Sequence, residues 1–298
     1  MKKNNKLRYA SGFDIAVFVL PALIVFTTFV IYPIIPELII SFQENDGFST
    51  KGWVGLDNYR AILNSDNFAL AHKNTYLTVA IALLGGFPFS LLLALLMDRT
   101  TPKVRNFFKF ASVFPCVLSP TVIARLWIAI YENDWGIINS LLRVIGLERL
   151  THAWLGEPKT VMACVAIAFV WQVIGLESLL LYAGIKSIPH TYYEAAEIDG
   201  GGFWLNSFYI TIPLLQDMIK YVILTLTLGA LGMFAFVNVM TLGGPGYSSR
   251  TVTYEMYLLA FVRSKFGQGC AIAVIFMAEC IVIALIINRF IAKEKIEY

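Results

Sequence analysis

Six long apolar stretches constrain this chain more than any other feature of its sequence. A helix that crosses a membrane needs about 20 mostly apolar residues to cover a hydrocarbon core of about 30 Å. Hydrophobic residues make up 58% of the 298 residues and charged residues only 14%, whereas soluble domains are about 45–50% apolar and roughly 25% charged. The sequence therefore predicts an all-α polytopic membrane protein with spans at residues 14–42, 75–97, 107–130, 159–183, 218–240 and 269–291.

The distribution of Lys and Arg predicts that both termini are cytoplasmic. With that orientation the cytoplasmic segments (1–13, 98–109, 184–220 and 289–298) hold 13 basic residues, and the external segments (43–74, 131–159 and 241–267) hold 9. Short cytoplasmic loops carry this kind of excess. The first stretch is too long for a signal-peptide core and lacks a small-residue cleavage site, so we expect an uncleaved span that Pro33 and Pro36 make irregular.

These boundaries divide the chain into a cytoplasmic N-terminal segment (1–13), a six-helix transmembrane domain (14–291) with a cytoplasmic loop at 184–217, and a cytoplasmic tail (292–298). In the external segment 131–159, apolar residues between Gly136 and Gly146 recur at helical spacing. This spacing predicts a short amphipathic helix on the outer surface.

The loop between the fourth and fifth spans is the most informative one. Glu194, Ala195 and Ala196 are good helix formers, Gly200 can end a helix in a left-handed cap, and Pro213 marks the start of the next span. We expect two short helices joined by a glycine-rich bend. Such a unit can dock another protein against its bare alanine surface, or it can lie on the membrane as an amphipathic helix-turn-helix.

Spacing within this loop resembles the EAA motif of ABC-importer permeases. That motif has EAA, three residues, G, nine residues and then I-x-L-P, and the chain departs from it only where Ile212 replaces Leu; the matching residues are Glu194, Ala195, Ala196, Gly200, Ile210 and Pro213. Three other segments are similar to segments of the maltose-type carbohydrate permeases, of the first-permease type: Gly55–Tyr59, Trp135–Leu142 and Thr241–Gly246.

This resemblance implies the type I ABC importer permease fold in a bacterial plasma membrane. Members of the family pair with a second permease, two cytoplasmic ATPases and an extracellular or periplasmic solute-binding protein. The helix around Glu194–Gly200 would be the coupling helix that converts ATP-driven closure into alternating access. The chain has no GxxxxGK[ST] phosphate loop. We therefore expect a transport subunit and not an enzyme, with no cofactor of its own and with ATP and Mg²⁺ in the partner ATPases.

Polar and aromatic residues within or beside the spans are candidates for a sugar pathway. A charge at the bilayer centre costs about 2.5–3.5 kcal/mol on insertion scales, so it usually faces a cavity or the bundle interior. The candidates are Arg125, Trp127, Trp171, Gln172, Glu177, Asn238 and Tyr247. The same residues could instead make interhelical hydrogen bonds, and Arg125 could reach outward to the membrane surface.

Two other classes of protein compete with the importer reading. A gradient-driven secondary transporter would use Glu177 or Glu279 as an ion relay and would not need the Glu194 loop. A membrane enzyme has little support, because HExxH is absent and the three histidines, His72, His152 and His190, are scattered through loops. No metal site is predicted.

Overall fold

The computed structural model describes residues 12–290, with side chains from residue 16 onward. Four helices are long and apolar enough to cross a membrane: Ala16–Ile40, Asp66–Arg99, Val161–Ser187 and Phe266–Phe290. Two bent helix pairs complete a set of up to six spans: Pro102–Val117 with Pro120–Ile130, and Phe203–Leu214 with Gln216–Leu231. The helical, polytopic class is confirmed. The predicted tail 292–298, and all but the last two residues of the predicted segment 1–13, lie outside the described residues.

Shorter elements connect and extend the spans. A two-stranded antiparallel hairpin, β1 (Gln43–Asn45) and β2 (Thr50–Trp53), and the helix α3 (Asp57–Leu63) follow the first span. Later in the chain come α8 (Ile137–Val144), η3 (Glu148–Leu150), α14 (Ala235–Met240), α15 (Val252–Tyr257) and η5 (Leu258–Val262). The predicted amphipathic helix between Gly136 and Gly146 is therefore present as α8.

Three π-helical turns come directly before prolines. They are η1 (Thr27–Ile31) between α1 (Gly12–Phe26) and α2 (Tyr32–Ile40), η2 (Ala82–Gly86) between α4 (Asp66–Ile81) and α5 (Phe87–Arg99), and η4 (Ser207–Thr211) between α11 (Phe203–Asn206) and α12 (Ile212–Leu214). A proline lacks an N–H donor, and its ring crowds the carbonyl four residues earlier. For Pro33, Pro88 and Pro213 that carbonyl lies within the π turn, where the wider ladder accommodates it. The irregularity predicted in the first span thus lies just ahead of Pro33.

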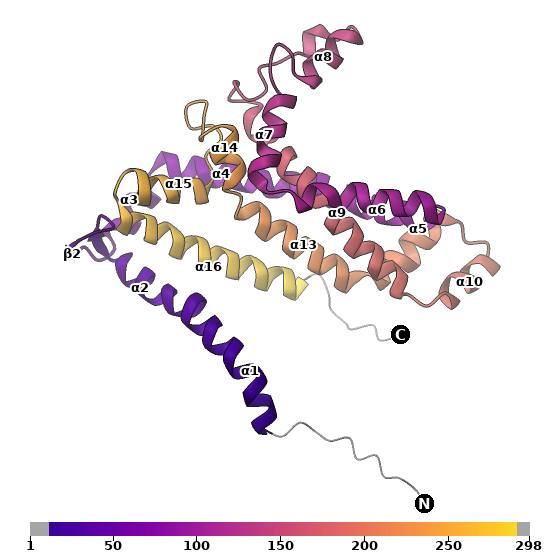
Figure 1. Cartoon of the computed structure of the whole chain (residues 1–298), viewed down its shortest axis with the longest axis horizontal. Coiled ribbons are helices and arrows are strands. Elements are labelled where there is room, and N and C mark those ends of the chain that lie inside the picture. The colour runs from indigo at the N-terminus through magenta and orange to yellow at the C-terminus, as the bar shows by residue number, and fades with distance from the viewer. Residues whose placement is uncertain (1–11, 291–298) are drawn as a thin grey trace, which may run out of the picture.

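The predicted third span, 107–130, is wrong as a single helix. It consists of α6 (Pro102–Val117) and α7 (Pro120–Ile130), which are bent by 102° relative to each other. Leu118 and Ser119 have extended backbones with ψ of 148° and 147°; for Ser119 this is expected because it directly precedes Pro120. The Ser119 side chain also accepts a hydrogen bond from the Val122 amide, which starts a new helix. As Figure 1 shows, α7 leaves the bundle and carries α8 away from it.

Other predicted boundaries also change. The second span, predicted at 75–97, is one helical run from Asp66 to Arg99, because its polar first turns face protein and not lipid. The fifth, predicted at 218–240, is α13 (Gln216–Leu231) followed by a break and then α14. The fourth and sixth, predicted at 159–183 and 269–291, correspond to α9 (Val161–Ser187) and α16 (Phe266–Phe290).

The helix α9 is the centre of the bundle. It packs against α4, α5, α6, α7, α13 and α14, and about half of its residues are buried. Gly175 marks its crossing with α6: a Cβ at this position would overlap the backbone carbonyl of Ser112. Only glycine permits two helices to approach this closely, so Gly175 sets the distance between α6 and α9.

The first span stands apart from this bundle. In Figure 1, α1 and α2 descend from the hairpin as an isolated arm, and only α2 contacts α16. None of the residues in the most apolar window of Ala16–Ile40 is buried. Lipid or a partner protein must therefore cover this helix in the membrane.

Candidate functional site

The predicted double-helix loop forms as α10 (Thr191–Ile198) and α11, with Gly200 between them. Gly200 has φ of +81°. Its amide donates to the Glu197 carbonyl at 3.1 Å, and the Gly201 amide donates to the Ala196 carbonyl at 2.7 Å. These two bonds make a Schellman cap, in which a left-handed glycine satisfies the last carbonyls of a helix. The predicted cap at Gly200 is confirmed.

No residue of the short helix α10 is buried. It lies at the end of the molecule farthest from the hairpin (Figure 1). Glu194 and Ala195 are exposed, Ala196 is half-buried, and the Glu194 carboxylate is 2.9 Å from Nδ1 of His190 one turn earlier. Because Ala195 is exposed and its side chain is small, the helix presents a surface that a partner's groove can enclose closely.

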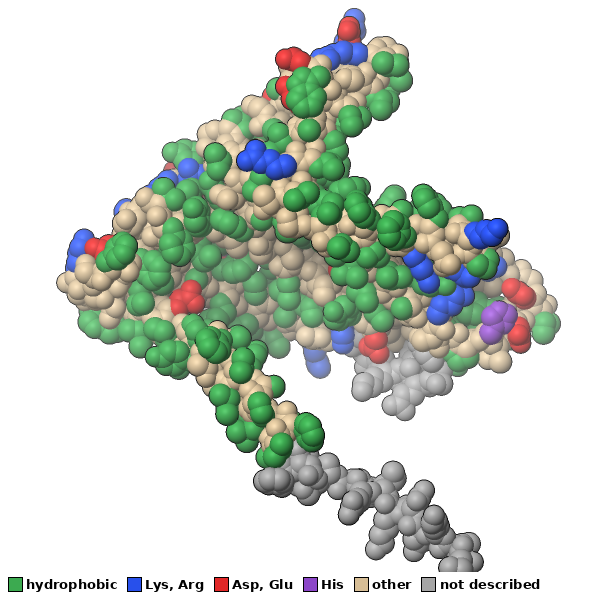
Figure 2. All heavy atoms as spheres, in the orientation of Figure 1, with side chains coloured by type: hydrophobic (Ala, Val, Ile, Leu, Met, Phe, Trp, Pro, Cys, Tyr) green, Lys and Arg blue, Asp and Glu red, His purple; other side chains and the backbone are tan. Residues whose placement is uncertain are grey.

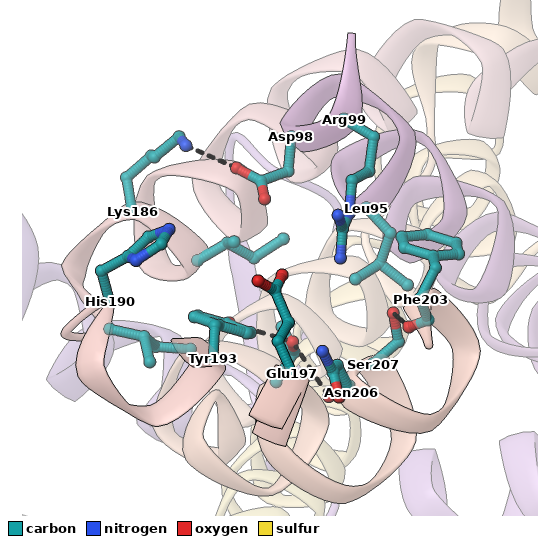
Figure 3. A pocket seen from close by; sticks show the side chains of 13 residues that line it. Leu95, Asp98, Arg99, Lys186, His190, Tyr193, Glu197, Phe203, Asn206 and Ser207 are labelled. Atoms are coloured by element: carbon teal, nitrogen blue, oxygen red, sulfur yellow. Dashed lines mark hydrogen bonds and ion pairs between the residues drawn. The ribbon is translucent and has the colours of Figure 1, made fainter. Parts of the chain in front are cut away.

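Behind α10, side chains from four helices fasten the loop to the bundle around a cavity of about 470 Å³ (Figure 3). Nζ of Lys186, at the end of α9, lies 2.6 Å from Oδ1 of Asp98, at the end of α5. The Arg99 guanidinium lies 5.2 Å from the centroid of the Phe203 ring in α11. The ends of the second and fourth spans are thus bridged to each other, and the end of the second span also contacts α11 of the loop.

The two halves of the loop are also bonded to each other. The hydroxyl of Tyr193 in α10 lies 3.0 Å from the hydroxyl of Thr211, and Thr211 donates to the Asn206 carbonyl. Burial raises the pKa of Tyr193, so the phenol keeps its proton at neutral pH and can hydrogen-bond. Ile210, in η4, is half-buried and Pro213 is exposed in α12, just before the chain bends by 76° into α13. The bend fixes the direction in which the loop leaves the bundle.

Of the seven predicted pathway residues, the structure brings two tryptophans together. Trp127 of α7 and Trp171 of α9 pack edge to face, with ring centroids 5.8 Å apart. Trp171 is 36% exposed, while the indole nitrogen of Trp127 is buried without a hydrogen-bond partner. Tyr131 continues the cluster, 5.1 Å from Trp127. The exposed surface of Trp171 is suited to stack on the apolar face of a ligand ring.

The remaining candidates are dispersed. Gln172 donates to the Leu118 carbonyl at 2.9 Å and so holds the break between α6 and α7. Glu177 accepts a hydrogen bond from Thr225 of α13 at 3.0 Å, and its second oxygen is buried without a partner. Arg125 is exposed and Asn238 is half-buried, and neither side chain is hydrogen-bonded to another residue of the described range 16–290.

Tyr247 is covered by Arg250, whose guanidinium lies 4.1 Å from the centre of the ring. Glu279, the other carboxylate proposed as a relay, lies 2.8 Å from Nε2 of His72 in α4. The Glu177 and Glu279 carboxylates therefore belong to separate helix contacts, α9 with α13 and α16 with α4.

Two clusters of charged side chains were not predicted from the sequence. Arg250 donates to the buried Glu255 at 2.8 Å, and Arg263 approaches the same carboxylate at 3.5 Å. Asp98 and Arg99 end the second span beside the loop described above. The adjacent Asp98 and Arg99 at the end of a span could have indicated their cluster from the sequence. The spacing of Arg250 and Glu255 gives no such sign that the two side chains meet.

The described residues thus form a polytopic helical protein with an exposed, capped helix at one end. Residues 86–296 match the family described as binding-protein-dependent transport system inner membrane component. The chain belongs to this family, and it is a multi-pass transport subunit of the inner membrane. The family predicted from the loop at Glu194–Pro213 is therefore confirmed.

Individual relatives are similar along most of their length. The chain is 35% identical to the probable ABC transporter permease protein YurN of Bacillus subtilis, covering 94% of this chain and 96% of the relative. It is 30% identical to the diacetylchitobiose uptake system permease protein NgcF of Streptomyces coelicolor, covering 89% and 78%. A chain of a bacterial ABC transporter involved in the import of the acidic polysaccharide alginate shares the fold, with a TM-score of 0.80, 24% identity and coverage of 92% and 93%.

Proposed function

We propose that this chain is a permease subunit of an ATP-driven, binding-protein-dependent importer that takes up a sugar or oligosaccharide. The observation that carries the proposal is α10, an exposed and capped helix that is bonded through Tyr193 to Thr211 before the fifth span and lies beside the Lys186–Asp98 bridge between the ends of the fourth and second spans. The uptake of diacetylchitobiose by a relative and the import of alginate by a structural neighbour support a carbohydrate substrate.

In this proposal α10 docks in a cleft of a cytoplasmic ATPase. Glu194, Ala195 and Ala196 form the contact, Gly200 sets the bend, and Ile210 and Pro213 pass the movement into the fifth span. ATP and Mg²⁺ bind to two partner ATPases. Among residues 12–290, no group of three or more His, Cys, Asp or Glu is placed to hold a metal ion.

A second permease completes the pathway. The first span, whose apolar surface lies outside the bundle, is suited to pack on that partner. The described start of α1 and the described end of α16 both lie away from the hairpin (Figure 1), which supports two termini on the cytoplasmic side with α10. The hairpin end then faces an external or periplasmic solute-binding protein.

The substrate would pass the tryptophan pair by alternating access. Trp127 and Trp171 are the residues best placed to stack on a sugar ring, because one face of the pair is exposed. Gln172, Glu177, Arg125, Asn238 and Tyr247 stay candidates for hydrogen bonds along the same path.

A pull-down of the tagged chain from its native membrane in mild detergent tests this function. We expect an ATPase and a second six-span permease to co-purify. The variant Glu194→Lys should lower the recovery of the ATPase without lowering that of the second permease. Glu148→Lys, on η3 beside α8, is the matched control and should recover both. Purification of the chain alone, under conditions that preserve a known importer, would contradict the proposal and favour gradient-driven transport.

A further inference from the structure

An apolar groove follows the outer side of α6 and has a volume of about 490 Å³. Its floor and walls come from Asn106, Lys109, Phe110, Val113, Phe114 and Val117, with a contribution from α9. Phe110, Phe114 and Val117 are 74%, 53% and 78% exposed. Exposed apolar side chains are ordinary on a helix that faces lipid, but a groove that begins at a lysine and continues over two phenylalanines is a more specific feature.

The length of the groove selects its occupant. The apolar part of the groove, from Phe110 to Val117, rises by about 11 Å at 1.5 Å per residue. This lies within the depth of one leaflet, which is half of a hydrocarbon core of about 30 Å. Beyond Val117 the chain bends by 102° into α7, which ends the groove. A transmembrane helix of a partner would span a surface more than twice as long, whereas part of one acyl chain fits this one.

The basic side chains of α6 favour a lipid with an anionic headgroup. The sequence of α6 contains Lys103, Arg105 and Lys109 in its first half and no acidic residue. Lys103 lies three residues, about one helical turn, before Asn106, and Lys109 lines the groove itself. The Lys109 ammonium lies 4.4 Å from the centre of the buried Tyr182 ring, which fixes it at the mouth of the groove. In Figure 2, Lys and Arg side chains gather at the end of the bundle near α10, beside a surface of hydrophobic side chains.

We propose that this groove binds one anionic phospholipid, with the phosphate between Lys103 and Lys109 and one acyl chain over Phe110, Phe114 and Val117. The cations recognise the phosphate and the second negative group of a phosphatidylglycerol headgroup, and the phenylalanines bury the chain. A zwitterionic phospholipid offers the same chain but a neutral headgroup, so it binds less tightly. The lipid lies against α6 where α6 crosses α9 at Gly175, and it stabilises that crossing.

Native mass spectrometry of the full chain in mild detergent tests the proposal, with phosphatidylglycerol and phosphatidylcholine of identical acyl chains added in turn. We expect phosphatidylglycerol to be retained preferentially. The variant Lys103→Gln/Lys109→Gln should weaken its retention by about 30-fold, from the loss of two cations near an anionic headgroup, and should leave phosphatidylcholine unchanged. Lys159→Gln, an exposed cation just before α9, is the matched control and should behave as the parent.

A second variant keeps the test decisive if removal of the Tyr182 contact disturbs folding. Val113→Trp fills the groove and leaves both lysines in place, so it should reduce the retention of both lipids. Equal retention of the two lipids by the parent, or unchanged retention in both variants, would overturn the proposal. So would loss of the lipid upon assembly with the second permease, because a protein surface would then cover α6.

Discussion

The crossing of α6 and α9 at Gly175 can be tested by adding a single methyl group. In Gly175→Ala, the new Cβ overlaps the carbonyl of Ser112, which is backbone and cannot rotate away. Insertion of extra volume into a tight contact costs typically 1–3 kcal/mol, and the rigid partner places this site at about 3 kcal/mol. Alanine in place of glycine stabilises a helix by about 1 kcal/mol. We therefore expect the free energy of unfolding to fall by about 2 kcal/mol.

The measurement is reversible unfolding of the full chain by titration with a denaturing detergent, followed by gel filtration to confirm that the variant is folded before titration. Gly85→Ala is the matched control, because a Cβ at Gly85 meets nothing within 4 Å. It should raise the free energy of unfolding by up to about 1 kcal/mol. If Gly175→Ala were as stable as the parent, the close approach of α6 and α9 would not exist in the membrane, and the packing argument would be refuted.

The remaining predictions concern the loop, the tryptophan pair and the hairpin. Gly200→Val should uncouple ATP hydrolysis from uptake, because its φ of +81° disfavours a β-branched residue; Gly202→Ala, which has φ of −83° and open space, should not. Truncating Trp127 or Trp171 to alanine should lower sugar uptake more than complex assembly, and equal loss of both would favour a packing role. Asp46 accepts hydrogen bonds from the amides of Phe48 and Ser49, which lower its pKa. The amides of the hairpin should therefore stay protected from hydrogen exchange above about pH 4 and lose part of this protection at lower pH. Constant protection down to about pH 3, after correction for intrinsic exchange, would contradict this.

Sequence periodicity and spacing predicted the loop well because its conformation is local. The cap at Gly200 depends on residues within six positions, and the sequence pattern contains all of them. Four long spans followed from apolar length in the same way, and the two bent helix pairs bring the number to six only where each pair is one span. The cap and the long apolar helices each depend on the residues of one continuous stretch of chain.

The features that the sequence did not predict correctly depend on tertiary contacts and on the local effect of a proline. Hydropathy extends across Leu118 and Ser119 without a break, so it predicted one span where Pro120 forces a bend of 102°. It also began the second span too late, because Asn74 is polar and yet buried, donating to the Arg250 carbonyl at 2.9 Å. The pathway candidates were chosen by residue type alone, and Gln172 is among those that bond to the chain's own backbone.

The 34-residue helical run from Asp66 to Arg99 has a consequence for how the two ends of the protein communicate. At one end Asn74 and Thr75 hold the backbone at Arg250 and Val252, and at the other Asp98 holds Lys186 beside α10. At 1.5 Å per residue the run is about 51 Å long, well beyond the thickness of a hydrocarbon core. Thermodynamic linkage makes the effect reciprocal: whatever free energy a ligand at α10 contributes to rearranging the 250–252 loop, a ligand at that loop contributes equally to α10. If a partner docks at α10 as proposed, this helical run would therefore transmit movement in both directions between α10 and the 250–252 loop.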